Sequence, residues 1–155
     1  MYPFDQKDPG RFIADFFTSF TEDLLRSDED AAMIVDRYHT PDIVEIADGY
    51  RIDREGLIEH AIPIRRNRPT IRVEAHEALA DGDRIAAIYT MHVRYPKKRL
   101  AIEVHFFGEF APDGRMRRSN MSTRILPADA NGGPSERAPA THDPSAHSGE
   151  DVAAA

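Results

Sequence analysis

The sequence predicts one α+β domain, in which three N-terminal helices precede an antiparallel sheet. The first observation is the segment 99–110, where large apolar side chains alternate with other side chains along the chain. A period of two is typical of a strand with one face in a core and the other face nearer to water. The second observation is the order of the segments. Helices gathered before consecutive strands are typical of a domain with the helices on one face of its sheet.

Three amphipathic segments predict the helices. The first begins at Asp8-Pro9, because Asp suits the N-cap and Pro suits the first helical position. Four phenylalanines then recur at helical spacing and form one broad apolar stripe. The second helix begins at Ser27, whose spacing to Asp30 resembles a capping box. Asp53 caps the third helix, which Pro63 ends or kinks.

Six segments predict strands. They are residues 42–47, 50–52, 70–79, 84–95, 99–110 and 115–126. The turns at residues 48–49, 81–82 and 111–114 each end in a glycine, which supplies the positive φ that tight hairpin turns need. The upstream helices must therefore cover the apolar face of the sheet.

Composition narrows the class of protein. A chain of 155 residues suits one domain, and the absence of cysteine excludes disulfides, thiolate nucleophiles and Cys-ligated zinc. The formal charge of -7 disfavours nucleic acid and anionic membranes as partners. No apolar run approaches the ~18 residues of a membrane span, and the N-terminus lacks the features of a secretion signal. We therefore expect a cytoplasmic protein without a metal or cofactor.

The composition changes at residue 127. Val152 is the only large aliphatic residue in the segment 127–155, which carries a formal charge of -4. Such a segment buries too little apolar area to offset the entropy of ordering. We expect a folded domain at residues 1–126, followed by a disordered acidic tail rich in Pro, Ala, Gly and Ser.

Four local sequences carry a resemblance to a known family. They are YHTPD at residues 38–42, DG at 48–49, DREGLIEH at 53–60 and FAPDGRM at 110–116. Together with the order of the elements, they make residues 12–126 resemble the nuclear transport factor 2-like superfamily and, within it, the SnoaL-like proteins. The resemblance implies a curved antiparallel sheet wrapped into a cone, with the three helices closing its side and an apolar pocket in its mouth.

The same resemblance implies a range of activities. Members bind apolar small molecules or catalyse proton transfer in polyketide cyclisation, steroid isomerisation, dehydration or epoxide opening, and many are homodimers packed through the sheet. SnoaL-like cyclases often carry a His in the first strand, where this chain has Ile46, two residues before Asp48. Their last strand carries a His-Trp-Asp run, where this chain has Ser119, Asn120 and Met121. Either the alignment slips by one residue, which reverses the faces of a strand, or the acid–base residues of the cyclases are absent.

Asp48 is the candidate base, because the resemblance places it at the mouth of the pocket. The alternative is a turn residue, since Asp before Gly is a common hairpin signal. Tyr38, Tyr89 and Asn120 are candidate hydrogen-bond partners for an oxyanion. His92 depends on the register of its strand, because Tyr89 and His92 lie on opposite faces. The expected pocket lining is Phe17, Leu57, Met91, Phe106 and Met121.

Other polar groups have simpler interpretations. We interpret His39 as a helix-capping residue. Glu103 and His105 share a strand face that opposes the apolar one, so solvent or a dimer contact is the default and a metal site is not expected. The arginine cluster 65–68 is interpreted as solvated loop charges.

Two functions follow from these patterns. The first is a SnoaL-like protein that binds a small apolar or aromatic molecule in a cone pocket, as a cofactor-free cyclase, isomerase or dehydratase. The second is a non-catalytic ligand-binding or dimerisation module of the same fold. In both cases Phe107, on the outer face of its strand, predicts a homodimer packed through the sheet.

Overall fold

The computed structural model describes residues 1–127. Its helices are the short turn η1 (Pro3–Asp5), α1 (Pro9–Arg26), α2 (Ala31–Tyr38) and α3 (Arg54–Asn67). Its strands are β1 (His39–Ala47), β2 (Tyr50–Asp53), β3 (Thr70–Asp81), β4 (Arg84–Arg94), β5 (Arg99–Phe110) and β6 (Met116–Ile125). The predicted tail lies outside the described residues from position 128 onward. Among residues 1–127, no helix combines the length and apolar character that crossing a membrane requires.

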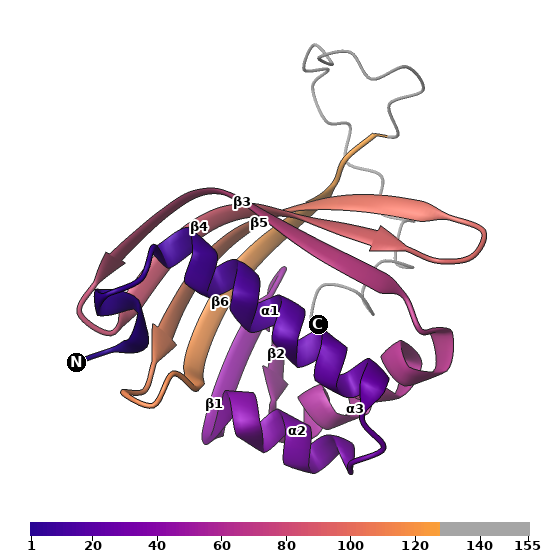
Figure 1. Ribbon diagram of the computed structural model, residues 1–155, viewed down its shortest axis with the longest axis horizontal. Coiled ribbons are helices and arrows are strands. Elements are labelled where there is room, and N and C mark those ends of the chain that lie inside the picture. The colour runs from indigo at the N-terminus through magenta and orange to yellow at the C-terminus, as the bar shows by residue number, and fades with distance from the viewer. Residues whose placement is uncertain (128–155) are drawn as a thin grey trace.

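The six strands form one curved sheet in the order β2-β1-β6-β5-β4-β3. Figure 1 shows the sheet arching over α1, with α2 and α3 on the same side. The α+β cone with three N-terminal helices is therefore confirmed. The sheet is mixed rather than purely antiparallel, because β6 lies parallel to β1. Alternation within a strand does not reveal this pairing, since the two strands are far apart in the sequence.

The helical stripe of α1 fills the hollow of the sheet. Phe17 contacts the rings of Tyr89 and Phe106 at centroid distances of 5.4 and 5.7 Å. On β5, Gly108 makes room for the Phe106 ring, because a Cβ there would lie 2.4 Å from that ring. The buried side chains of α1 are Phe12, Ile13, Phe16, Phe17, Phe20, Thr21 and Leu24. The aromatic stripe of α1 thus packs into a core of aliphatic and aromatic side chains.

Two of the three predicted helix starts are confirmed. Asp8 accepts a hydrogen bond from the Arg11 amide, and Asp53 accepts one from the Gly56 amide. The second start is wrong: Asp30 caps α2, while the Ser27 hydroxyl donates to Glu29 before the helix begins.

Pro63 lies inside α3 rather than at its end. The helix continues beyond the proline to Asn67. Ile64, which directly follows Pro63, is buried in the core. Packing of this last turn therefore outweighs the helix-ending tendency of proline.

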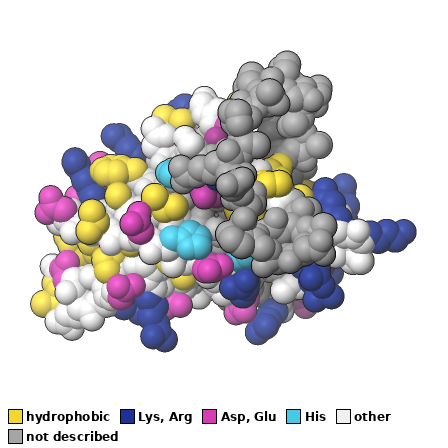
Figure 2. All heavy atoms as spheres, turned by 90° about the horizontal axis from the view of Figure 1, so that it is seen from above, with side chains coloured by type: hydrophobic (Ala, Val, Ile, Leu, Met, Phe, Trp, Pro, Cys, Tyr) yellow, Lys and Arg dark blue, Asp and Glu magenta, His cyan; other side chains and the backbone are white. Residues whose placement is uncertain are grey.

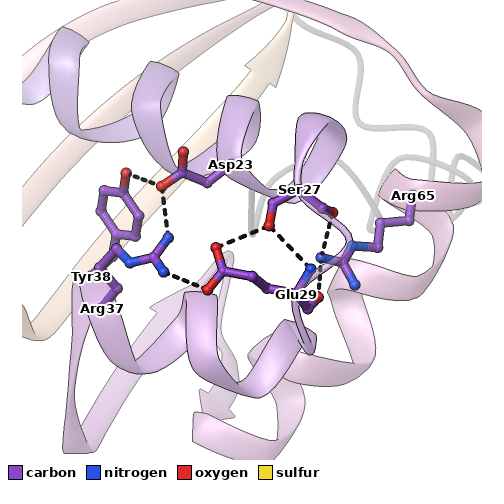
Figure 3. Close-up of polar contacts among 6 residues, drawn as sticks. All are labelled: Asp23, Ser27, Glu29, Arg37, Tyr38 and Arg65. Carbon is purple, nitrogen blue, oxygen red and sulfur yellow. Dashed lines mark hydrogen bonds and ion pairs between the residues drawn. The ribbon is translucent and has the colours of Figure 1, made fainter.

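Arg65 is not a solvated loop charge. Its guanidinium donates to the backbone carbonyls of Leu24, Ser27 and Glu29 at 2.9, 3.2 and 2.6 Å. Figure 3 shows the side chain reaching from α3 toward the connection between α1 and α2. Arg65 therefore satisfies carbonyls at the end of α1 and in the α1–α2 connection, and it joins both to α3.

Replacing Arg65 by Ala should lower the free energy of unfolding by about 2 kcal/mol, because three carbonyls lose a charged donor. Urea denaturation monitored by circular dichroism measures the loss. Arg66→Ala is the matched control, since Arg66 is exposed on the same helix turn. Equal stability of the two variants would contradict the role of Arg65.

Candidate functional site

Asp48 lies in the exposed turn between β1 and β2, where its φ is 51°. Its carboxylate accepts hydrogen bonds from the backbone amide and the hydroxyl of Thr123. The backbone amide of Asp48 in turn donates to the carbonyl of Met121. These contacts fasten the end of β1 to β6, and they favour the turn interpretation of Asp48 over the catalytic one.

Tyr38 belongs to a polar network in the helix layer (Figure 3). Its hydroxyl donates to Asp23 at 2.6 Å, and Asp23 also accepts from Arg37 at 3.2 Å. Burial and the neighbouring Asp23 carboxylate raise the pKa of Tyr38 above its usual range. The hydroxyl is thus bonded within the helix layer.

The registers of β4 and β6 place the other polar candidates. Tyr89 is buried on the inner face of the sheet, whereas Asn120 is exposed. His92 lies on the outer face, where its Nε2 is 2.9 Å from the Glu74 carboxylate. The five expected lining residues are all buried in the core: Phe17, Leu57, Met91, Phe106 and Met121. Of the predicted polar site residues, Tyr89 alone is both buried and directed to this interior.

Glu45 is a functional candidate that the sequence analysis missed. It lies on the inner face of β1 between Ile43 and Ala47, and only 2% of it is exposed. Burial raises the pKa of its carboxyl to about 8. Within residues 1–127, neither Glu45 Oε2 nor the hydroxyl of its register partner Ser119 has a hydrogen-bond partner.

His39 lies next to this carboxyl and is equally buried. Its Nδ1 is 2.9 Å from the Val35 carbonyl, which can only accept, so Nδ1 carries the proton. Its Nε2 then presents a lone pair toward Glu45, at 3.9 Å from Oε1. Burial lowers the pKa of His39 to about 4, although the Val35 carbonyl and Asp36 oppose the shift. The expected capping contact at the end of α2 is present, and it also orients the ring.

The arrangement places a neutral carboxylic acid beside a neutral imidazole in an apolar core. The imidazole ring packs edge-on against Phe16 and Phe20, and Tyr89 is buried in the same core. Burial and the nearby Glu45 carboxyl raise the pKa of Tyr89, which keeps its phenol protonated. A desolvated carboxyl with a pKa near neutrality is suited to give and take protons.

Weak signals explain why sequence reasoning missed Glu45. Both faces of β1 carry apolar side chains, with Ile43 and Ala47 inside and Val44 and Ile46 outside. Alternation therefore does not decide which face of β1 is buried. The structure places Ile46 outside and buries Glu45, an ionisable side chain one residue before the position at which the resemblance implied a His.

Two grooves lie side by side on the outer face of the sheet. The larger, about 530 Å³, has a floor at Ala86 between Leu79 and Phe107. The smaller, about 500 Å³, lies beside Ile46, and Phe107 and Asn120 line both. Figure 2 looks onto the molecule from above and shows hydrophobic side chains beside histidines and acids, with basic side chains toward the edges. No cluster of possible metal ligands occurs among the residues that the structure describes.

Comparisons with known proteins agree with this architecture. The family model described as a SnoaL-like domain matches residues 13–119. IdmH, a proposed polyketide cyclase from Streptomyces antibioticus, is 14% identical with a TM-score of 0.54, covering 75% of this chain and 91% of its own. An LEH-like epoxide hydrolase from M. tuberculosis is 21% identical with a TM-score of 0.52, covering 74% and 84%. A de novo designed NTF2 fold protein is 16% identical with a TM-score of 0.52, covering 72% and 84%.

These structural similarities show the fold alone. No curated protein matches the chain.

The raised pKa of Glu45 should make stability depend on pH. The buried, protonated carboxyl contributes its full stability below pH 4.5, the pKa of the side chain in the unfolded chain. This contribution is lost as the pH rises through the folded-state pKa of about 8. The lowered pKa of His39 acts oppositely, but only between about 4 and 6.5. Between pH 6.5 and 8, wild type should therefore lose about 1.4 kcal/mol per pH unit relative to Glu45→Gln, measured by urea unfolding. A constant difference between the two proteins would contradict the buried, protonated carboxyl.

Proposed function

The chain belongs to the SnoaL-like family, and from that premise we propose that it performs acid–base chemistry on a small molecule, with Glu45 as the proton-transfer group. The single observation that supports this proposal is the buried carboxyl of Glu45, whose Oε2 has no partner within residues 1–127. The reaction class is a cofactor-free cyclisation, isomerisation or dehydration. The substrate is a small apolar or aromatic molecule, because the carboxyl lies in an apolar core that contains Phe16, Phe20 and Tyr89.

Glu45 suits this role better than Asp48. An enzymatic base needs a free lone pair and a pKa near the working pH. Asp48 has both carboxylate oxygens bonded to Thr123 on the surface, whereas burial raises the Glu45 pKa to about 8. In this proposal Asp48 stabilises the turn and Glu45 moves the proton.

Small residues beside Glu45 suggest how a substrate is accommodated. Ser119 pairs with Glu45 in the sheet, and Gly108 pairs with Ser119 on the next strand. The Phe106 ring lies over Gly108, and turning it aside would open space next to Ser119. The hydroxyls of Ser119 and Tyr89 would then be the donors for an oxyanion that forms when a C–H proton is removed.

A non-catalytic role has one specific observation in its favour. Phe107 is 46% exposed and stands between two outer grooves of about 530 and 500 Å³. On a two-fold axis, the Phe107 ring of each copy would enter a groove of the other. A homodimer packed through the sheet is therefore part of the proposal, with or without catalysis.

The proton-transfer role is tested with ketone probes. The purified chain is incubated in D₂O with small aromatic ketones, and exchange of their α-protons is followed by NMR. Glu45→Gln should slow exchange by about 10²–10⁴-fold, because the proton acceptor is removed without a change in shape. Asp48→Asn is the control and should exchange at the wild-type rate, because the amide side chain can keep both contacts with Thr123 that hold the turn while it loses the carboxylate. Loss of exchange only in Asp48→Asn would return the role to Asp48.

The dimer is tested by sedimentation equilibrium at micromolar concentration. Wild type should have the mass of two chains, and Phe107→Lys should have the mass of one, because a charge replaces the ring between the grooves. Met33→Lys is the matched control, since Met33 is 60% exposed on α2, away from this face. A monomeric wild type would reject the dimer.

A further inference from the structure

His39 hydrogen-bonds through Nδ1, and among the hydrogen bonds of residues 1–127 none involves Nε2, the nitrogen that faces Glu45. The other nitrogen, Nδ1, caps α2 through the Val35 carbonyl, and this bond fixes the tautomer. Nε2 is therefore a buried proton acceptor, 3.9 Å from the Glu45 carboxyl. That separation is about 1 Å longer than a hydrogen bond, so a small rotation of the Glu45 side chain closes it.

We propose that His39 Nε2 and the Glu45 carboxyl share one proton, which makes His39 the positioning residue that lets Glu45 ionise inside the closed core. The inference rests on the proposed function only in taking Glu45 as the acting carboxyl. In the step itself, the O–H bond of Glu45 breaks and the Nε2–H bond of His39 forms. The product is a carboxylate beside an imidazolium, and no proton enters or leaves the interior.

The neighbouring ionisable groups are compatible with this exchange. Tyr89 from β4 keeps its proton, because burial raises its pKa. Asp36 from α2 is bound by Arg54 at 2.7 and 2.9 Å, so the pKa of Asp36 is lowered and its charge favours an imidazolium at His39. From α1, the ring of His39 meets only the rings of Phe16 and Phe20 among its aromatic contacts.

Without a shared proton, a carboxylate formed at Glu45 would stand alone in the core. An unpaired buried charge is costly, whereas a paired one is offset by its partner. His39 is therefore the group that makes ionisation of Glu45 compatible with the closed conformation.

The experiment uses the full-length chain without substrate. Side chains are labelled with ¹⁵N at histidine and ¹³C at the glutamate carboxyl, and both signals are followed by NMR from pH 5 to pH 10. A shared proton predicts a change in the ¹⁵N chemical shift of His39 Nε2. Relative to the unprotonated value, the shift should move by roughly a tenth or more of the way to the fully protonated value. The displacement should disappear at the same pH midpoint at which Glu45 loses its proton.

Two variants serve as controls. Glu45→Gln should leave Nε2 unprotonated above about pH 6, two units above the His39 pKa of about 4. His39→Asn keeps a donor at the Nδ1 position for the Val35 carbonyl, so it should preserve the fold, and its Glu45 signal should still titrate. A wild-type Nε2 signal that stays at its unprotonated position would overturn the shared proton.

Exchange assays on the same variants separate the two proposals. If both proposals hold, His39→Asn should slow ketone exchange by at least roughly tenfold. The pH dependence of the exchange rate should also change shape in this variant. If Nε2 is never displaced but Glu45→Gln still abolishes exchange, the shared proton fails and the proposed function stands. If Nε2 is displaced but Glu45→Gln exchanges normally, the shared proton stands and the proposed function fails.

Discussion

The parallel register between β1 and β6 is the constraint on which the site depends. Glu45 pairs with Ser119 in this register, so both side chains face the interior, and Ile46 and Asn120 face outward. A shift of one residue would exchange the two faces. The bonds of Asp48 to Thr123 and Met121 fix the register at the end of β1. Asp48 therefore matters for the site through the geometry of the sheet, even though it lies outside the interior.

The protonation states of the core follow from competing energies of similar size. The Glu45 pKa of about 8 and the His39 pKa of about 4 imply that moving the proton to His39 costs about 5 kcal/mol before the charges attract. Attraction between the charges at 3.9 Å returns about 4 kcal/mol at an effective dielectric constant of ~20. Without substrate the neutral pair has the lower free energy, and the free energy of the ionic pair is only slightly higher. A modest change in the surroundings, such as an oxyanion nearby, would then shift the proton.

The sequence predicted the elements better than it predicted the site. The helical stripe of α1 and the alternation of β5 are strong local patterns, and both were confirmed. The predicted start of α2 was wrong because Ser27 and Asp30 are both good caps, and Asp30 is the one that accepts from an amide in the first turn of the helix. The parallel pairing of β1 and β6 is a long-range contact that no local pattern contains. Since that pairing decides the inner face of β1, Glu45 was out of reach of the same reasoning.

Strand β5 connects the two faces of the sheet. Phe106 points into the core over Gly108, and Phe107, the next residue, stands between the outer grooves. Alternation means that the backbone which orients one ring also orients the other. A partner copy packed on Phe107 would therefore hold this part of β5 rigid while the Phe106 ring turns above Gly108. The outer contact and the inner site would then require the same strand geometry, which is a physical reason for one fold to combine dimerisation with chemistry in its interior.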